Sequence, residues 1–176
     1  NKDAKMETTR RSFLKAGALG ALVLAAGGGI YRAVHTPRLE RFVLDGEARA
    51  ALNAIVPAML AGALPASAAE RRAAIGAAIE GVHAAVSNLP LAVQKEVQDL
   101  FGLLALAPAR RLLTGVSGGW ENADPQQVSA FLQDWRLHRL ALLRTAYGAL
   151  HDLSLGAWYA QPASWHAIGY PGPLKE

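Results

Sequence analysis

The chain has 176 residues, of which 52% are hydrophobic, and a mean hydropathy of +0.15, so it can bury one core and is not intrinsically disordered. Its formal net charge of +4 comes entirely from residues 1–33, which hold six Lys or Arg and two Asp or Glu, so the rest of the chain is neutral. A neutral body lacks the basic footprint of a nucleic-acid-binding domain. The absence of cysteine excludes disulfides, iron–sulfur clusters, c-type haem attachment and cysteine-ligated zinc.

Residues 9–15 read Thr-Arg-Arg-Ser-Phe-Leu-Lys and match the twin-arginine consensus for export. The translocase receptor reads this motif as an address, and it is not itself an anchor. We therefore predict that residues 1–34 are a twin-arginine signal. The residues expected to carry the signal are Arg10, Arg11, Phe13, Leu14 and Lys15.

An uncharged segment rich in Ala, Gly and Leu follows over residues 16–31. As a helix it would reach about 24 Å, short of the roughly 30 Å hydrocarbon layer, although Lys15 and Arg32 could snorkel to close the gap. No clean Ala-x-Ala cleavage site is present, so removal of the signal and its retention as a membrane anchor both stay open. The positive charges before it predict a cytoplasmic N-terminal side and a periplasmic, inner-membrane-associated body.

The rest of the chain predicts an all-α fold, because apolar residues recur at three- and four-residue spacing and no stretch alternates with period two. We expect a linker over residues 35–46 and then a helical domain over 47–176, an irregular bundle of about five helices that ends in an aromatic, Pro- and Gly-rich tail from about residue 158. The expected helices cover residues 47–61, 68–87, 91–106, 108–113 and 125–150. Pro57 should kink or break the first of them.

Asp124-Pro125 predicts the start of the longest helix, with an aspartate N-cap and proline at the first helical position. Its expected buried stripe consists of Val128, Phe131, Leu132, Trp135, Leu142, Ala146, Leu150 and Leu153.

Three patterns could carry chemistry, and each has a simpler interpretation. Residues 115–119 fit the Gly-x-Ser-x-Gly nucleophile elbow, but a helix rather than a strand is predicted before them, which favours a plain Gly-rich loop. Glu80-x-x-His83 is half of a di-iron signature without a second copy, which favours a surface or partly buried histidine. Asp134 and His138 lie one helical turn apart and favour a solvated ion pair, with a small enzyme built on them as the less favoured alternative.

The aromatic residues near the end of the chain have two interpretations. They pack back over the protein's own helices, or they form an interface, because Trp and Tyr bring large contact area at low entropic cost. The residues predicted to bind a partner are Trp135, Trp158, Tyr159, Trp165, Tyr170, Pro171 and Pro173.

The chain resembles the small (gamma) subunits of bacterial membrane-associated, FAD-dependent sugar and alcohol dehydrogenases, the group called gluconate 2-dehydrogenase subunit 3. The resemblance follows the order of motifs over most of the chain: a twin-arginine leader, a Glu-x-x-x-x-Leu-x-x-Ile helix from Glu47, Phe-Leu-x-x-Trp-Arg from Phe131, and the closing Trp-x-x-Ile-Gly-Tyr-Pro-Gly-Pro from Trp165. The family's Leu-Pro followed by an acidic residue is replaced here by Leu64-Pro65-Ala66.

The resemblance implies a non-catalytic subunit without a cofactor of its own. Its partner would be a flavoprotein of the glucose–methanol–choline oxidoreductase type that carries FAD and lacks a signal. The small subunit would bind this folded partner in the cytoplasm and escort it through the twin-arginine translocase, and a multihaem cytochrome c subunit often accepts the electrons. A stand-alone, membrane-tethered helical protein that binds a lipid or small apolar ligand stays open as an alternative.

Overall fold

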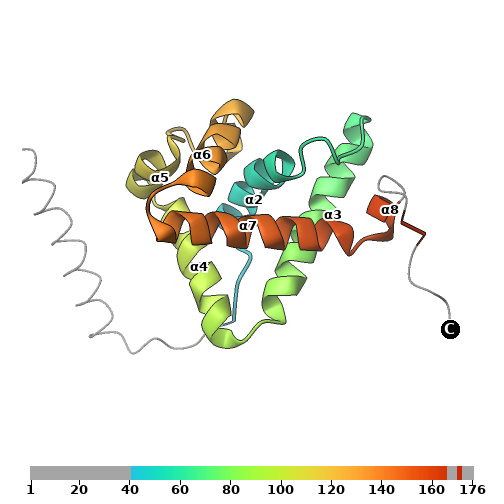
Figure 1. The fold of residues 1–176 in the computed structure, drawn as a ribbon, viewed down its shortest axis with the longest axis horizontal. Helices are drawn as coiled ribbons and strands as arrows, with labels where there is room; N and C mark the ends of the chain where they lie inside the picture. Colours follow the sequence, from blue (N-terminus) through green and yellow to red (C-terminus); the bar gives the residue numbers. More distant parts are fainter. Residues whose placement is uncertain (1–40, 166–169, 172–176) are drawn as a thin grey trace, which may run out of the picture. The chain divides into compact units, whose positions relative to one another are not determined.

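The computed structural model describes residues 41–165, 170 and 171, and these residues form helices and no strands. The prediction of an all-α fold is confirmed for this part of the chain. In chain order the elements are α2 (Gly46–Met59), α3 (Ala68–Ser87), α4 (Leu91–Ala105), α5 (Ala107–Thr114), the 3-10 helix η1 (Trp120–Asn122), α6 (Pro125–Leu137), α7 (Ala141–Tyr159) and α8 (Pro162–Trp165) (Figure 1). The predicted signal or anchor over residues 1–34, residues 35–40 of the linker and Pro173 lie outside the described residues.

Helix α2 lies at the centre of the core and packs against α3, α4, η1, α6 and α7. Its Leu52, Ile55 and Val56 are at most 1% exposed, because they recur at the spacing that places them on one face. Asp45 caps its first turn by accepting the N–H of Ala48 at 2.8 Å. Pro57 leaves the helix unbroken to Met59, since it stands in the last turn, so the predicted break does not occur there.

Helices α3 and α7 cross at close range, and Figure 1 shows α7 running across α3. A Cβ built on Gly81 of α3 would lie 3.0 Å from the Cβ of Ala157 on α7. Small residues at the crossing therefore let the two backbones approach, as ridge-and-groove packing requires.

Two buried indoles bind carbonyls at the ends of neighbouring helices. Trp120 Nε1 donates to Leu104 O in the last turn of α4 at 3.0 Å, and Trp135 Nε1 donates to Leu113 O in the last turn of α5 at 2.9 Å. The last carbonyls of a helix have no partner within it, so each indole satisfies a group that would otherwise be left unpaired.

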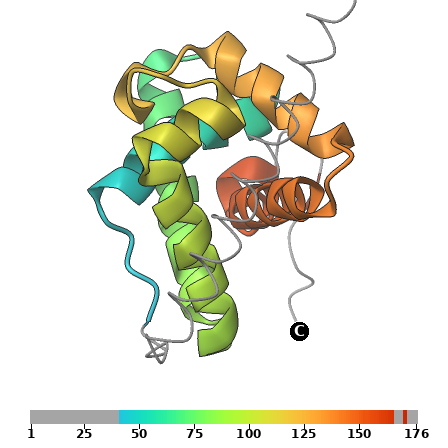
Figure 2. The same ribbon diagram turned by 90° about the vertical axis from the view of Figure 1, so that its left-hand side faces the viewer.

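The prediction of one helix from Pro125 to Leu150 is wrong, because the chain bends after Leu137 and starts α7 at Ala141. The N–H of Leu140 donates to His138 Nδ1 at 3.1 Å, and Arg144 Nη1 donates to the His138 and Arg139 carbonyls at 2.6 and 3.1 Å. These side-chain bonds replace the helical ones, and the bend returns α7 across the bundle, as Figure 1 shows from the side and Figure 2 with α7 seen nearly end-on.

The bend also changes which residues of the predicted stripe are buried. The four residues on α6 and Leu150 are buried, Ala146 and Leu153 are half-buried, and Leu142 is 75% exposed. The structure therefore corrects the prediction for Leu142, which belongs to the bend and not to the core.

Candidate partner-binding surface

Tyr159, Trp165 and Tyr170, referred to below as the aromatic cluster, lie together where α7 meets α8. Trp165 Nε1 donates to Tyr159 O at 2.9 Å, and the N–H of Tyr170 donates to Trp165 O at 3.0 Å. The rings of Trp165 and Tyr170 meet edge to face with their centroids 5.4 Å apart. Tyr159 is 39% exposed and Tyr170 is 47% exposed, so both tyrosines face solvent on a backbone that these hydrogen bonds hold in place.

The turn between α7 and α8 holds the cluster in place. Gln161 Nε2 donates back to Ala157 O at 3.2 Å, and the hydroxyl of the fully buried Ser164 donates to Gln161 O at 2.7 Å. Pro162 then starts α8, where its missing N–H costs nothing. The tyrosine and tryptophan backbones are thus positioned before any partner arrives, which lowers the entropic cost of binding.

The structure divides the seven predicted partner-binding residues. The three of the aromatic cluster and Pro171 reach the surface, whereas Trp135 and Trp158 are 1% and 3% exposed and form part of the core. For these two residues the structure favours the other interpretation of the aromatics, packing against the protein's own helices. Trp158 also belongs to α7 and not to an irregular tail, because the helix runs on to Tyr159.

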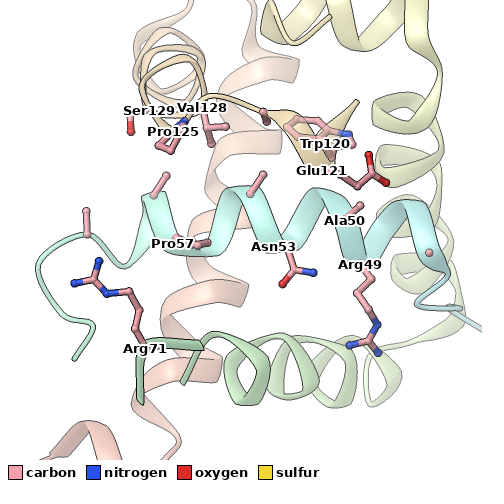
Figure 3. Close-up of a pocket in the computed structure, with 15 residues that line it drawn as sticks. Arg49, Ala50, Asn53, Pro57, Arg71, Trp120, Glu121, Pro125, Val128 and Ser129 are labelled. Atoms are coloured by element: carbon pink, nitrogen blue, oxygen red, sulfur yellow. The ribbon is translucent and has the colours of Figure 1, made fainter. Parts of the chain in front are cut away.

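A groove, which was not predicted from the sequence, runs along α2. It is an open groove of about 810 Å³ between α2, the start of α3, η1 and the start of α6 (Figure 3). Small residues at four-residue spacing form its floor, namely Gly46, Ala50, Ala54 and Ala58. That spacing is visible in the sequence and could have indicated one smooth face of the helix.

Charged side chains stand along the rim of this groove. Arg49 binds Glu80 of α3 at 2.7 Å, and Arg71 Nε donates to Pro65 O at 3.0 Å. Figure 3 shows these arginines toward opposite ends of α2, with Glu121 on the side of η1. The groove is therefore lined by small apolar residues of α2 and also by polar side chains, which include Asn53 in the middle of the helix.

Two of the residues considered for catalysis have structural partners. Glu80 pairs with Arg49, and the ring of His83 packs on Phe42 with centroids 5.9 Å apart. Ser117 is exposed in a loop that follows helix α5, so the strand of a nucleophile elbow is replaced by a helix, as predicted.

Asp134 and His138 meet at 4.0 Å on the surface, with their side chains 67% and 25% exposed, and neither lines the groove along α2. His138 Nδ1 accepts a backbone N–H, so in the neutral imidazole the proton is on Nε2, facing Asp134. Within residues 41–165, no group of three or more Asp, Glu or His side chains is placed to bind a metal ion.

No helix in the described part of the chain is long and apolar enough to cross a membrane. Comparison with protein-family models, curated proteins and solved structures finds no match. The resemblance to the dehydrogenase small subunits therefore stays a prediction from the motifs.

Proposed function

We propose that this protein is the non-catalytic small subunit of an exported flavoprotein dehydrogenase complex. It binds the folded, FAD-loaded catalytic subunit in the cytoplasm, escorts it through the twin-arginine translocase and stabilises or tethers it at the inner membrane on the periplasmic side. The chain itself holds no cofactor in this proposal, and FAD belongs to the partner. A multihaem cytochrome c is a further expected member of the complex.

The observation that carries this proposal is the aromatic cluster. Tyr159 and Tyr170 are 39% and 47% exposed, while hydrogen bonds fix the backbone around Trp165. Rigid, half-exposed aromatic residues are the type that dominates binding energy at protein interfaces. The twin-arginine motif adds an export signal for a protein bound there.

Co-purification tests the interface. The tagged full-length chain, isolated from the membranes of its native host, is expected to bring a flavoprotein whose FAD is released on denaturation. The double variant Tyr159→Ser/Tyr170→Ser should reduce the recovered FAD about 30-fold or more, since two hot-spot aromatics are lost. Leu89→Ser, at a leucine that is 36% exposed on the α3–α4 turn, is the matched control and should leave recovery unchanged. Equal recovery with all three proteins would contradict the assigned interface, and recovery of no flavoprotein would contradict the partner.

Export is tested separately by changing the signal. Arg10→Lys/Arg11→Lys should leave both this chain and its flavoprotein in the cytoplasm, because the receptor reads the paired arginines. Wild-type protein expressed beside the same flavoprotein is the control. Periplasmic flavoprotein in cells that carry only the variant would rule out the escort role.

A second candidate function is binding of a lipid or small apolar ligand, which the groove along α2 favours. Ala54 lies in the middle of its floor, so Ala54→Leu should block the groove and reduce binding of a fluorescent fatty acid about tenfold. Ala77→Leu, on the exposed face of α3, is the control. Unchanged fatty-acid binding in Ala54→Leu would exclude the groove as the site.

A further inference from the structure

Residues 136–144, referred to below as the arginine–leucine bend, join α6 to α7 and expose three large apolar side chains. Leu137 is 79% exposed, Leu140 is 55% exposed and Leu142 is 75% exposed. Figures 1 and 2 both show this bend at an edge of the helical body. Soluble proteins rarely expose three large apolar side chains within six residues, and such a group typically marks an interaction site.

The charge of the bend has one sign. Arg136, Arg139 and Arg144 are all exposed, and none of them forms an ion pair with an acidic residue among those described. The nearest acidic side chain in sequence, Asp134, faces His138 instead. A surface that combines negative charge with an apolar interior would complement both the arginines and the leucines of the bend.

The bend is also held in one shape. The guanidinium of Arg144 donates to two carbonyls of the turn, and the N–H of Leu140 donates to His138 Nδ1. The leucines are thus presented by a fixed turn, and the loss of entropy on contact is correspondingly small.

We propose that the arginine–leucine bend rests on an anionic phospholipid surface. The leucines would enter the boundary between the headgroups and the acyl chains, while Arg136 and Arg139 would contact the phosphates. Interfacial amphipathic helices place their apolar and basic residues in the same way. A second copy of the chain would bring arginines against arginines, which disfavours self-association here. This inference extends the tethering part of the proposed function, and because its test uses lipid alone, its failure leaves the test of the flavoprotein partner untouched.

A fluorescent probe on the bend separates contact between the bend and lipid from any insertion of residues 16–31 into the vesicle. The chain has no cysteine, so Leu140→Cys in the full-length protein can carry a single polarity-sensitive fluorophore. Leu91→Cys on the α3–α4 turn is the matched control, because Leu89, Leu91 and Val93 are also exposed there but residues 73–94 contain no Lys or Arg.

Vesicles of phosphatidylglycerol with phosphatidylcholine should shift the emission of the Leu140→Cys label to the blue, and vesicles of phosphatidylcholine alone should shift it much less. Arg136→Gln/Arg139→Gln in the same labelled protein should weaken the apparent affinity about tenfold or more, as should about 1 M salt, where the Debye length is about 3 Å. Arg144 is left in place because it holds the turn. The Leu91→Cys label should not shift.

Three results would overturn the inference. Equal shifts at residues 140 and 91 would mean that the whole protein is drawn to the vesicle without this bend in contact. A shift that ignores lipid charge would remove the arginines from the contact. No shift with lipid, but protection of the Leu140→Cys label in the co-purified complex, would assign the bend to a protein partner.

Discussion

At the scale of the residue, Gln94 shows how one buried amide can join three segments. Its Oε1 accepts the N–H of Phe42 at 2.9 Å, and its Nε2 donates to Ser87 O and Leu89 O at 3.0 and 2.8 Å. The side chain thereby connects the chain before α2, the end of α3 and the helix α4 on which it lies. A glutamine inside an apolar helix pattern looks like a surface residue, so sequence periodicity could not have revealed it.

Gln94→Met should destabilise the protein by about 2–3 kcal/mol, because it keeps the volume and leaves buried backbone groups unpaired. Urea denaturation measures this as a fall in the midpoint at constant slope. Gln98→Met is the control, since Gln98 accepts only the exposed N–H of Val43 and should cost about 0.5 kcal/mol or less. Equal effects of the two substitutions would contradict the structural role of Gln94.

Trp135 carries a second prediction at this scale, which also separates a core role from a binding role. Trp135→Phe leaves Leu113 O without its donor and shrinks a ring that meets Phe131 edge to face at 5.4 Å, so it should cost about 2 kcal/mol. Trp165→Phe loses a similar bond at the surface and should cost about 0.5 kcal/mol or less. Denaturation midpoints of the two variants test this, and a larger loss for Trp165→Phe would reverse the assignment.

At the scale of the element, the sequence predicts helices best where end signals and periodicity agree. The prediction of residues 68–87 coincides with α3, and the Asp124-Pro125 start is confirmed, with Asp124 accepting the N–H of Gln126 at 2.8 Å. The bend at residues 138–140 escaped prediction because neither Gly nor Pro marks it and its bonds come from His138 and Arg144. The same bend brings Leu142 to the surface, although periodicity placed it on the buried stripe.

The crossing of α3 and α7 makes two glycines of one helix behave differently. Gly76→Ala meets nothing within 4 Å and should stabilise the protein by about 0.5–1 kcal/mol through helix propensity. Gly81→Ala brings a Cβ to 3.0 Å from that of Ala157, so it should instead destabilise by about 1 kcal/mol as the helices are forced apart. Thermal or urea denaturation checks the opposite signs. Stabilisation by both substitutions would mean that the crossing is looser than described.

At the scale of the whole molecule, the site depends on where the helices end. The aromatic cluster forms because α7 continues past Trp158 and stops at the turn before α8, and the groove exists because α6 starts beside α2. Residue types pointed to Tyr159, Trp165 and Tyr170, and the helical spacing of the apolar residues already placed Trp135 on a buried stripe, but no pattern in the sequence showed that Trp158 is buried. The burial of Trp158 depends on contacts between helices that are distant in sequence, such as α3 and α7.

One continuous core should also make the described part of the chain unfold as a unit. Buried residues of α2, α3, α4, α6 and α7 belong to the same cluster, so no helix among them has a core of its own.

Hydrogen exchange followed by mass spectrometry tests this single-core description directly with Gly81→Ala. A loss of about 1 kcal/mol should speed exchange of the slowest amides about fivefold in peptides from α2 as well as from α3 and α7, although α2 does not contain the substitution. Gly76→Ala should slow the same peptides. Faster exchange in α3 and α7 with α2 unchanged would show that the crossing opens as a separate unit, and the single-core description would then fail.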